Sequence, residues 1–345
     1  MLSKNKLVIV SVMLVAAFVL AACAQTTTPT VAPVVKTTAP NATEVVPTPT
    51  LDPNDPANVT GDIASAGSST VYPLSEAIQA LFESEGYAGQ HTIASVGTGG
   101  GFERFCKTGE TDIANASRAI KTAEVENCAA INRIPVEFRV GTDAIAIVVS
   151  KANTFLTNVT SEELLKIFAS DAQKWSDVNA AWPTEDILRF TPGTDSGTFD
   201  FFVEVVVQKP LKLATLDEAK PLVLEVTNIQ TSEDDNVLVQ GVEGSPYAIG
   251  YFGFAYFKEQ EANLTVVSIN DVTPSFETAE DGSYLLSRPL FIYSDAGVLK
   301  AKPQVAAFIT FYLDRVNEVI GEVGYFPASD AALAESKAAL ENALK

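Results

Sequence analysis

Four short apolar segments of this 345-residue chain each run into a turn rich in Gly, Ser or Thr, or in polar side chains. Three of the turns precede a helical pattern, and they are residues 67–70, 97–101 and 191–198. The fourth segment, residues 112–118, ends on the guanidinium of Arg118. Strands that alternate with helices predict an α/β fold, in which groups at the carboxyl ends of the strands gather at one edge of a sheet.

The turn at 191–198 has the composition of an anion-binding helix start. Ser196, Gly197 and Thr198 stand just before an apolar stretch, with Asp195 in front of them. The first N–H groups of a helix have no partner within the helix and attract anions, to which hydroxyl groups add donors. An ordinary helix cap with nothing bound is the alternative reading.

The glycine turn at 97–101 is not followed by Gly-Lys-Ser/Thr, so it is not a nucleotide P-loop. No catalytic base stands beside any of the four turns. The pattern therefore favours reversible binding of a small oxyanion over chemistry on it, with no catalytic residues.

The start of the chain has the pattern of an export signal. Lys4 and Lys6 precede the apolar run 7–22, which is short for a membrane span, and residues 20–23 (Leu-Ala-Ala-Cys) resemble a bacterial lipobox. We expect residues 1–22 to be a lipoprotein signal peptide and Cys23 to be lipidated. A transmembrane helix with an incidental Cys is the alternative.

Residues 23–58 are rich in Thr, Pro, Val and Ala without helical or strand period, which predicts a disordered tether of about 30 Å. The remainder, 59–345, is long enough for two lobes.

Charge limits the partners of the exported chain. Removal of residues 1–22 leaves 21 basic against 43 acidic residues, a formal balance of −22. Nucleic acid and anionic lipid reward clustered Lys and Arg, so neither is an expected partner. An anionic ligand must then be held by local N–H and hydroxyl donors.

With Cys23 lipidated, Cys106 and Cys128 form an even pair, which in an exported protein predicts a disulfide. Two buried thiols or a metal pair are the alternatives, and the metal is discounted because no third soft ligand is near. His91, the only histidine, lies among polar residues and is expected at the surface, so no Ser-His-Asp site is predicted. No metal and no cofactor are expected.

Two further features have structural interpretations. Residues 232–236 superficially resemble a calcium loop, but Ser232 and Asp235 fit a helix capping box better. Trp175 and Trp182 are expected to pack in a core or on a lobe surface and not to serve as stacking platforms.

Taken together, these segments resemble the phosphate-binding proteins of bacterial ABC phosphate importers over residues 60–327. The resemblance rests on residues 67–73, 97–102, 112–118, 193–200, 232–242, 249–252 and 289–293. The resemblance implies a type II periplasmic-binding-protein fold, with two α/β lobes joined by two hinge strands near 145–149 and 251–257. Lobe I would comprise 59–147 and 255–345, and lobe II 148–254.

The resemblance also implies where phosphate is held. The contacts map to one residue set: Ser69 and Thr70 in the first turn, with Ser68 as the alternative to Ser69, Thr98 in the second, and Ser196, Gly197 and Thr198 in the third. The family tends to place an Asp at position 118 and an Arg near 193–194. In this chain Arg118 would supply the positive charge that the family places near 193–194, and Asp143 or Asp195 would accept the phosphate proton. Alternatively, Arg118 pairs with a neighbouring acid and both aspartates are caps.

By this resemblance the protein is a monomeric, non-enzymatic receptor that captures inorganic phosphate. It would be lipid-anchored on the extracytoplasmic side of the cell membrane and would deliver phosphate to the transmembrane subunits of an ABC permease. A receptor or sensor for sulfate or molybdate, and a secreted phosphatase, are the alternatives.

Overall fold

The computed structural model describes residues 52–194 and 196–345. The predictions for the signal peptide, Cys23, most of the tether and Asp195 lie outside these residues. The strands are β1 Ile63–Gly67, β2 His91–Ser95, β3 Ile113–Ala116, β4 Pro135–Ser150, β5 Asn158–Val159, β6 Leu188–Pro192, β7 Ile229–Ser232, β8 Ala248–Gly253, β9 Leu264–Val266, β10 Ser268–Ile269 and β11 Ser287–Asp295.

Helices lie between most of these strands. They are η1 Pro56–Asn58, α1 Tyr72–Ser84, α2 Gly97–Glu103, η2 Arg104–Thr108, α3 Thr122–Ala130, α4 Ser161–Ala169, α5 Trp175–Val178, α6 Gly197–Val203, η3 Glu204–Gln208, α7 Lys209–Leu211, α8 Leu216–Leu224, α9 Asp235–Glu243, α10 Phe254–Glu259, α11 Phe276–Glu280, α12 Ala296–Ala301, α13 Pro303–Val319 and α14 Asp330–Leu344.

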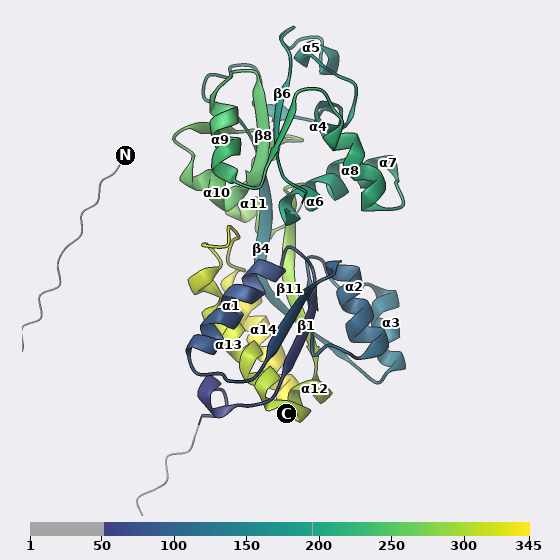
Figure 1. The fold of residues 1–345 in the computed structure, drawn as a ribbon, viewed down its shortest axis with the longest axis vertical. Helices are drawn as coiled ribbons and strands as arrows, with labels where there is room; N and C mark the ends of the chain where they lie inside the picture. The colour runs from purple at the N-terminus through teal and green to yellow at the C-terminus, as the bar shows by residue number, and fades with distance from the viewer. Residues whose placement is uncertain (1–51, 195) are drawn as a thin grey trace, which may run out of the picture. The chain divides into compact units, whose positions relative to one another are not determined.

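The long strand β4 belongs to two sheet regions. Its residues up to Ala144 pair antiparallel with β11, and from Ile145 onward it pairs with β8 and β9. The strand order is β2-β1-β3-β11-β4-β8-β6-β7. Every residue of β4 from Val140 to Ser150 is buried, as expected for a strand covered on both faces. In Figure 1, β4 and β11 run between one group of helices and the other, which confirms the predicted α/β fold of two lobes.

Each lobe has its own apolar core. In the first lobe, Leu74, Ile78 and Phe82 recur at helical spacing on α1 and pack into a cluster that includes α13. The second lobe contains two clusters, one on each side of its sheet region. Trp175 is fully buried in one of them, and Trp182 packs against it with ring centroids 5.7 Å apart, so both have the packing role predicted for them.

The second hinge lies elsewhere than the sequence suggested. Residues 254–259 form helix α10, and β8 pairs inside the second lobe, so the continuous apolar run there is not a crossing. Tyr284 and Leu286 belong to a second-lobe core, whereas Leu290 belongs to the first. We therefore propose that the chain returns at β11, with lobe I as 59–144 and 287–345 and lobe II as 145–286.

Two helix starts differ from expectation. Helix α2 begins at Gly97 and not near Phe102, so the glycine turn is its first turn. A Cβ at Gly101 would lie 2.5 Å from the Cα of Gly67, which explains why only glycine fits where α2 crosses β1. Asp234 caps α9 through the N–H of Asn236, so the predicted Ser232–Asp235 capping box is wrong.

His91 is buried, contrary to the prediction of a surface residue. Only 8% of it is exposed, its Nε2 lies 2.7 Å from the hydroxyl of Ser65, and its ring meets the edge of Phe308 of α13 at 4.5 Å between centroids. Its sequence neighbours are polar, but a helix more than two hundred residues away covers it.

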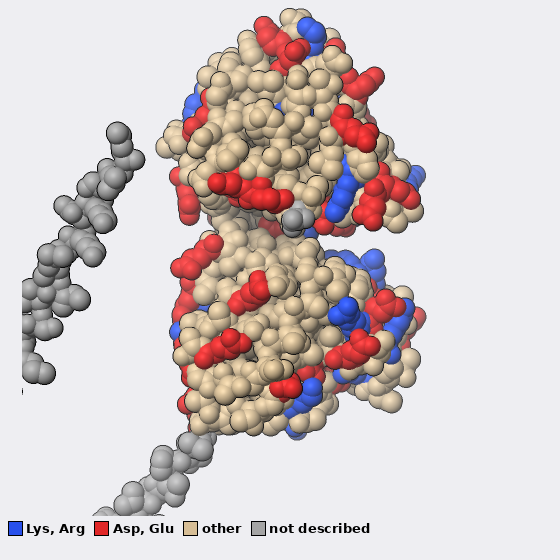
Figure 2. All heavy atoms as spheres, viewed as in Figure 1, with Lys and Arg blue, Asp and Glu red and all other residues tan. Residues whose placement is uncertain are grey.

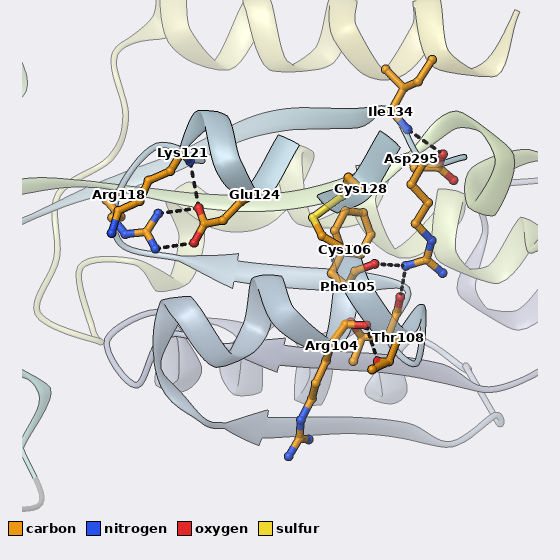
Figure 3. Close-up of a disulfide and its surroundings, with 12 residues drawn as sticks. Arg104, Phe105, Cys106, Thr108, Arg118, Lys121, Glu124, Cys128, Ile134 and Asp295 are labelled. Carbon is orange, nitrogen blue, oxygen red and sulfur yellow. Dashed lines mark hydrogen bonds and ion pairs between the residues drawn. A yellow bond between two sulfur atoms is a disulfide. The ribbon is translucent and has the colours of Figure 1, made fainter. Parts of the chain in front are cut away.

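The sulfurs of Cys106 and Cys128 are bonded in the structure, as predicted. Figure 3 shows that the bond joins η2, which continues α2, to α3. Both cysteines are buried with Phe102, Phe105 and Tyr293. Helices α2 and α3 both carry groups near the carboxyl ends of the strands. The disulfide therefore limits the movement of these groups relative to one another.

We expect the paired substitution Cys106→Ala/Cys128→Ala to lower the free energy of unfolding by about 3 kcal/mol, because the cross-link closes a loop of 22 residues. Urea denaturation of both proteins measures this. The wild type in reductant should move toward the variant, and intact mass of untreated wild type should show no free thiol at these two positions. A wild type that already carries both thiols would contradict the pairing.

Candidate functional site

A pocket of about 700 Å³ opens where the strand ends of the first lobe face α6 and η3 of the second. Figure 2 shows a hollow between the two parts of the body, with Lys and Arg side chains on both sides of it. The predicted site residues that line this pocket are Ser68, Ser69, Thr70, Thr98 and Arg118. The structure thus brings two of the predicted turns and the predicted cation together.

The first turn presents the start of α1 to the pocket. Gly67 has φ +151°, and a Cβ there would lie 2.0 Å from the carbonyl oxygen of Asn115, so only glycine ends β1 this way. The N–H groups of Thr70 and Val71 donate to the Ser68 hydroxyl at 3.2 and 3.4 Å. No side chain caps α1 at Val71. The N–H groups of Thr70 and Val71, just before α1, therefore have only long bonds that an anion can replace, whereas the N–H of Tyr72 donates to the Ser68 carbonyl at 3.0 Å.

The second turn joins Thr98 to Ser117. The two hydroxyls lie 3.2 Å apart, and the N–H of Ser117 donates to Thr98 Oγ1 at 3.2 Å. Ser117 also lines the pocket. Sequence reasoning missed Ser117, although it precedes Arg118 at the end of the fourth segment and carries the hydroxyl type that the other turns share.

Arg118 reaches the pocket but is already paired. Its two terminal nitrogens donate to the two carboxylate oxygens of Glu124 at 2.8 and 2.7 Å, and the N–H of Lys121 donates to the same carboxylate (Figure 3). Burial pushes the pKa of Glu124 upward, but the hydrogen bonds from Arg118 and Lys121 outweigh it and leave the pKa below its ordinary value. The pairing with a neighbouring acid, the alternative raised from the sequence, is present.

Arg288 is the cation that sequence reasoning missed. It lines the pocket from β11, its Nε donates to Asp143 Oδ2 at 2.9 Å, and its Nη2 donates to the carbonyl of Gly197 at 3.1 Å. Its guanidinium also stacks over the ring of Phe201 at 3.9 Å from the centroid. Arg288 therefore touches Asp143 of the first hinge strand and the start of α6 at once.

Asp143 lies behind Arg288 and does not line the pocket. Only 1% of it is exposed, and its Oδ1 has no hydrogen-bond partner among the described residues. A buried carboxylate oxygen without a donor is uncommon, because leaving it unsatisfied costs free energy. It is a candidate acceptor for a ligand proton.

The third turn stands beside the pocket and not among its lining residues. Ser196 caps α6 by accepting from the N–H of Thr198 at 3.2 Å, and a Cβ at Gly197 would lie 3.2 Å from Thr70 Oγ1. The second-lobe lining comes instead from Asp200, Phe201, Glu204, Val205, Lys209, Leu216 and Leu285. Ser196, Gly197 and Thr198 thus adjoin the first turn.

Comparison with known proteins identifies the family. The pattern of the PBP superfamily domain matches residues 27–316. The phosphate-binding protein PstS of Staphylococcus haemolyticus is 34% identical over 275 residues, 77% of this chain and 80% of that protein. The chain belongs to the PstS family of the PBP superfamily. This membership confirms the resemblance inferred from the turns.

Two other proteins are similar over a comparable length. Protein SphX of Synechococcus elongatus is 39% identical over 275 residues, 77% of each chain. The crystal structure of a possible phosphate binding protein from Planctomyces limnophilus is 40% identical, with a TM-score of 0.76, and the match covers 83% of this chain and all of that one.

Residues 52–194 and 196–345 lack two further features. No helix in this part of the PstS-family chain is long and apolar enough to cross a membrane. The same residues hold no group of three or more His, Cys, Asp and Glu side chains arranged for a metal ion.

Proposed function

We propose that this protein captures inorganic phosphate between its two lobes and delivers it to the transmembrane subunits of an ABC permease. The observation that carries the proposal is the pocket in which the turn at the start of α1, the Thr98–Ser117 hydroxyls and the Arg288 guanidinium meet. Relatives named phosphate-binding protein support the choice of ligand.

The donors suit a tetrahedral oxyanion held against an adverse overall charge. Backbone N–H groups and hydroxyls bind the anion without a broad basic patch, and one guanidinium adds charge-assisted hydrogen bonds. Closure of the lobes would add the N–H groups and hydroxyls of Ser196, Gly197 and Thr198. These residues already adjoin the first turn through Gly197 and Thr70.

Asp143 supplies the selectivity in this proposal. Phosphate at neutral pH still carries a proton and can donate a hydrogen bond to the unpartnered Oδ1 once closure of the lobes brings the anion to Asp143, which lies outside the pocket lining in this structure. Sulfate has no proton and meets only charge repulsion. Asp195 is the other acceptor that the sequence suggested. Asp143 is preferred because it is buried and is ion-paired with Arg288.

The remainder of the proposal concerns location. Cys23 would carry the lipid, and residues 23–58 would tether a monomeric, non-enzymatic receptor on the extracytoplasmic side of the membrane. The lipobox supports the anchor, and the names of the relatives support binding over catalysis. Mass spectrometry of the protein purified from membranes would test for a diacylglycerol on Cys23.

Calorimetric titration of ligand-stripped protein with phosphate, arsenate, sulfate and molybdate tests the ligand. We expect heat with phosphate and arsenate, which both carry a proton at neutral pH, and none with sulfate. Absence of heat with phosphate would overturn the proposed function. Preferential heat with sulfate or molybdate would favour a receptor for another oxyanion.

The same titration applied to Thr98→Val should show phosphate affinity weakened by about 1 to 3 kcal/mol, because the anion loses a hydroxyl donor in a dry site. Ser196→Ala should have an effect of the same size if α6 closes on the anion. Thr310→Val is the control, since that hydroxyl bonds only the Ala306 carbonyl on α13. Normal affinity in both test variants would place the site elsewhere.

A further inference from the structure

Residues 324–329, which follow α13 in the chain, contact both lobes through the neighbouring side chains of Tyr325 and Phe326. The backbone of this segment is also bonded to β4. The N–H of Phe326 donates to the carbonyl of Thr142 at 2.9 Å, and the N–H of Thr142 donates back to the carbonyl of Phe326 at 2.9 Å. Thr142 lies two residues before the end of the β4 stretch that pairs with β11. The segment is therefore attached at the point where β4 passes from one lobe to the other.

Tyr325 reaches toward the first phosphate-binding turn. Its hydroxyl donates to the carbonyl of Thr70 at 2.9 Å. This carbonyl and the N–H of Val71 belong to one peptide group, so the bond fixes the direction of an N–H at the start of α1. A hydrogen bond to the carbonyl also polarises the peptide and strengthens the N–H as a donor.

The Tyr325 hydroxyl lies near the Asp143–Arg288 ion pair of the candidate phosphate site. Burial raises its pKa, and the nearby Asp143 carboxylate adds to the rise while Arg288 opposes it. The hydroxyl is therefore protonated at neutral pH and can donate to the Thr70 carbonyl. Tyr325 lies close enough to the Asp143–Arg288 pair for both charges to shift its pKa.

Phe326 packs into the other lobe. Its ring lies 5.2 Å from that of Phe254 and 6.0 Å from that of Phe276, and Phe254 belongs to a second-lobe core. Glu280, on the same helix as Phe276, accepts from the N–H of Ser329 at 3.1 Å and from Arg139 of β4 at 2.8 Å. The second lobe thus holds residues 326–329 by a ring cluster and a carboxylate.

We propose that residues 324–329 form a third link between the lobes, in which Tyr325 is a positioning residue for the first phosphate-binding turn. The inference rests on the proposed function. Tyr325 and Phe326 are neighbours in the chain, and their backbone is tied to Thr142. Rotation of the second lobe about β4 therefore moves the Phe326 ring and, with it, the Tyr325 hydroxyl. Closure of the lobes and alignment of the α1 start are coupled through this link.

Tyr325→Phe tests the positioning role, because it keeps the ring and removes only the hydroxyl. Tyr87→Phe is the matched control, since the Tyr87 hydroxyl donates to the Gly61 carbonyl in the same lobe and does not line the pocket. Calorimetry and thermal unfolding are measured for both. We expect Tyr325→Phe to weaken phosphate binding about three- to ten-fold, the range of one hydrogen bond, and Tyr87→Phe to lower only the melting temperature.

A double-variant cycle tests the coupling. Phe326→Leu keeps an apolar side chain but loses the ring contacts, and it should weaken phosphate binding by itself. The effects of Tyr325→Phe and Phe326→Leu should not add, because both act through one segment. Small-angle scattering without and with phosphate should show a smaller change on binding in Phe326→Leu than in the wild type.

The outcomes separate the two levels of the argument. A wild type that gives no heat with phosphate overturns the proposed function and this inference with it. A wild type that binds, together with Tyr325→Phe of unchanged affinity, overturns the positioning role alone. Additive effects in the cycle overturn the coupling between the lobes.

Discussion

Arg288→Gln should weaken phosphate binding by a hundred-fold or more, on the order of 3 kcal/mol. The substitution removes the guanidinium that lines the pocket and leaves Asp143, which is 1% exposed, without its ion-pair partner. A buried, unpaired carboxylate repels an anion as well as destabilising the fold. Calorimetry gives the affinity, and urea denaturation shows how much of the protein remains folded during the titration.

Two further variants, one at the same position and one outside the pocket, serve as comparisons for Arg288→Gln. Arg288→Lys keeps a charge but loses the planar fork, so its affinity should fall between those of the wild type and Arg288→Gln. Lys302→Gln breaks an ion pair with Asp112 in the first lobe, 2.7 Å long and outside the pocket lining, and should leave phosphate affinity unchanged. Wild-type affinity in Arg288→Gln would remove Arg288 from the site.

Arg118 and Asp143 complete this experiment. Arg118→Gln should cost less affinity than Arg288→Gln, because Glu124 already occupies both terminal nitrogens of Arg118. The opposite order would restore Arg118 as the principal cation.

Asp143→Asn should reduce the difference in binding affinity between phosphate and sulfate, since an amide no longer repels an anion without a proton. If sulfate is still rejected, the acceptor lies elsewhere.

The part of the site that could be predicted is the part encoded locally. A strand followed at once by Gly, Ser or Thr and then by a helix determines where the hydroxyls of Ser68, Thr70 and Thr98 lie, because the turn and the helix start are set by adjacent residues. The parallel strands β1 and β3 then bring the first turn and Arg118 to one edge. The turns themselves needed no long-range information, and only their meeting at one edge depends on strand pairing.

Arg288 required long-range information. It lies directly opposite Asp143 in the antiparallel register of β11 and β4, although the two residues are 145 positions apart in the chain. The sequence suggested Asp143 as a site residue and did not single out Arg288. Pairing them needs the register, which depends on the packing of the whole sheet. The second hinge, which the resemblance put near 251–257 and which we propose at β11, depends in the same way on pairing between strands far apart in the chain.

His91 should make the protein measurably less stable between pH 7 and pH 5. Burial lowers its pKa to about 4 in the folded protein, against about 6.5 in the unfolded chain. Its Nδ1 has no hydrogen-bond partner among the described residues, and Nε2 meets only the Ser65 hydroxyl, so nothing compensates a positive charge there.

The sign follows from proton binding. Between pH 6.5 and pH 4 the unfolded chain binds a proton at His91 and the folded protein does not, so the free energy of unfolding falls as the pH falls. The loss is about 2 kcal/mol by pH 5 and about 3 kcal/mol once the pH is below 4.

Because His91 is the only histidine, a single substitution isolates this term. Urea denaturation of the wild type and His91→Gln at pH 5 and 7 provides the measurement. The variant is expected to be less stable at pH 7, since it disturbs a buried contact with Ser65, but to lose much less stability than the wild type on moving to pH 5. Equal losses in the two proteins would mean that His91 is protonated in the folded state and that carboxylates account for the acid sensitivity.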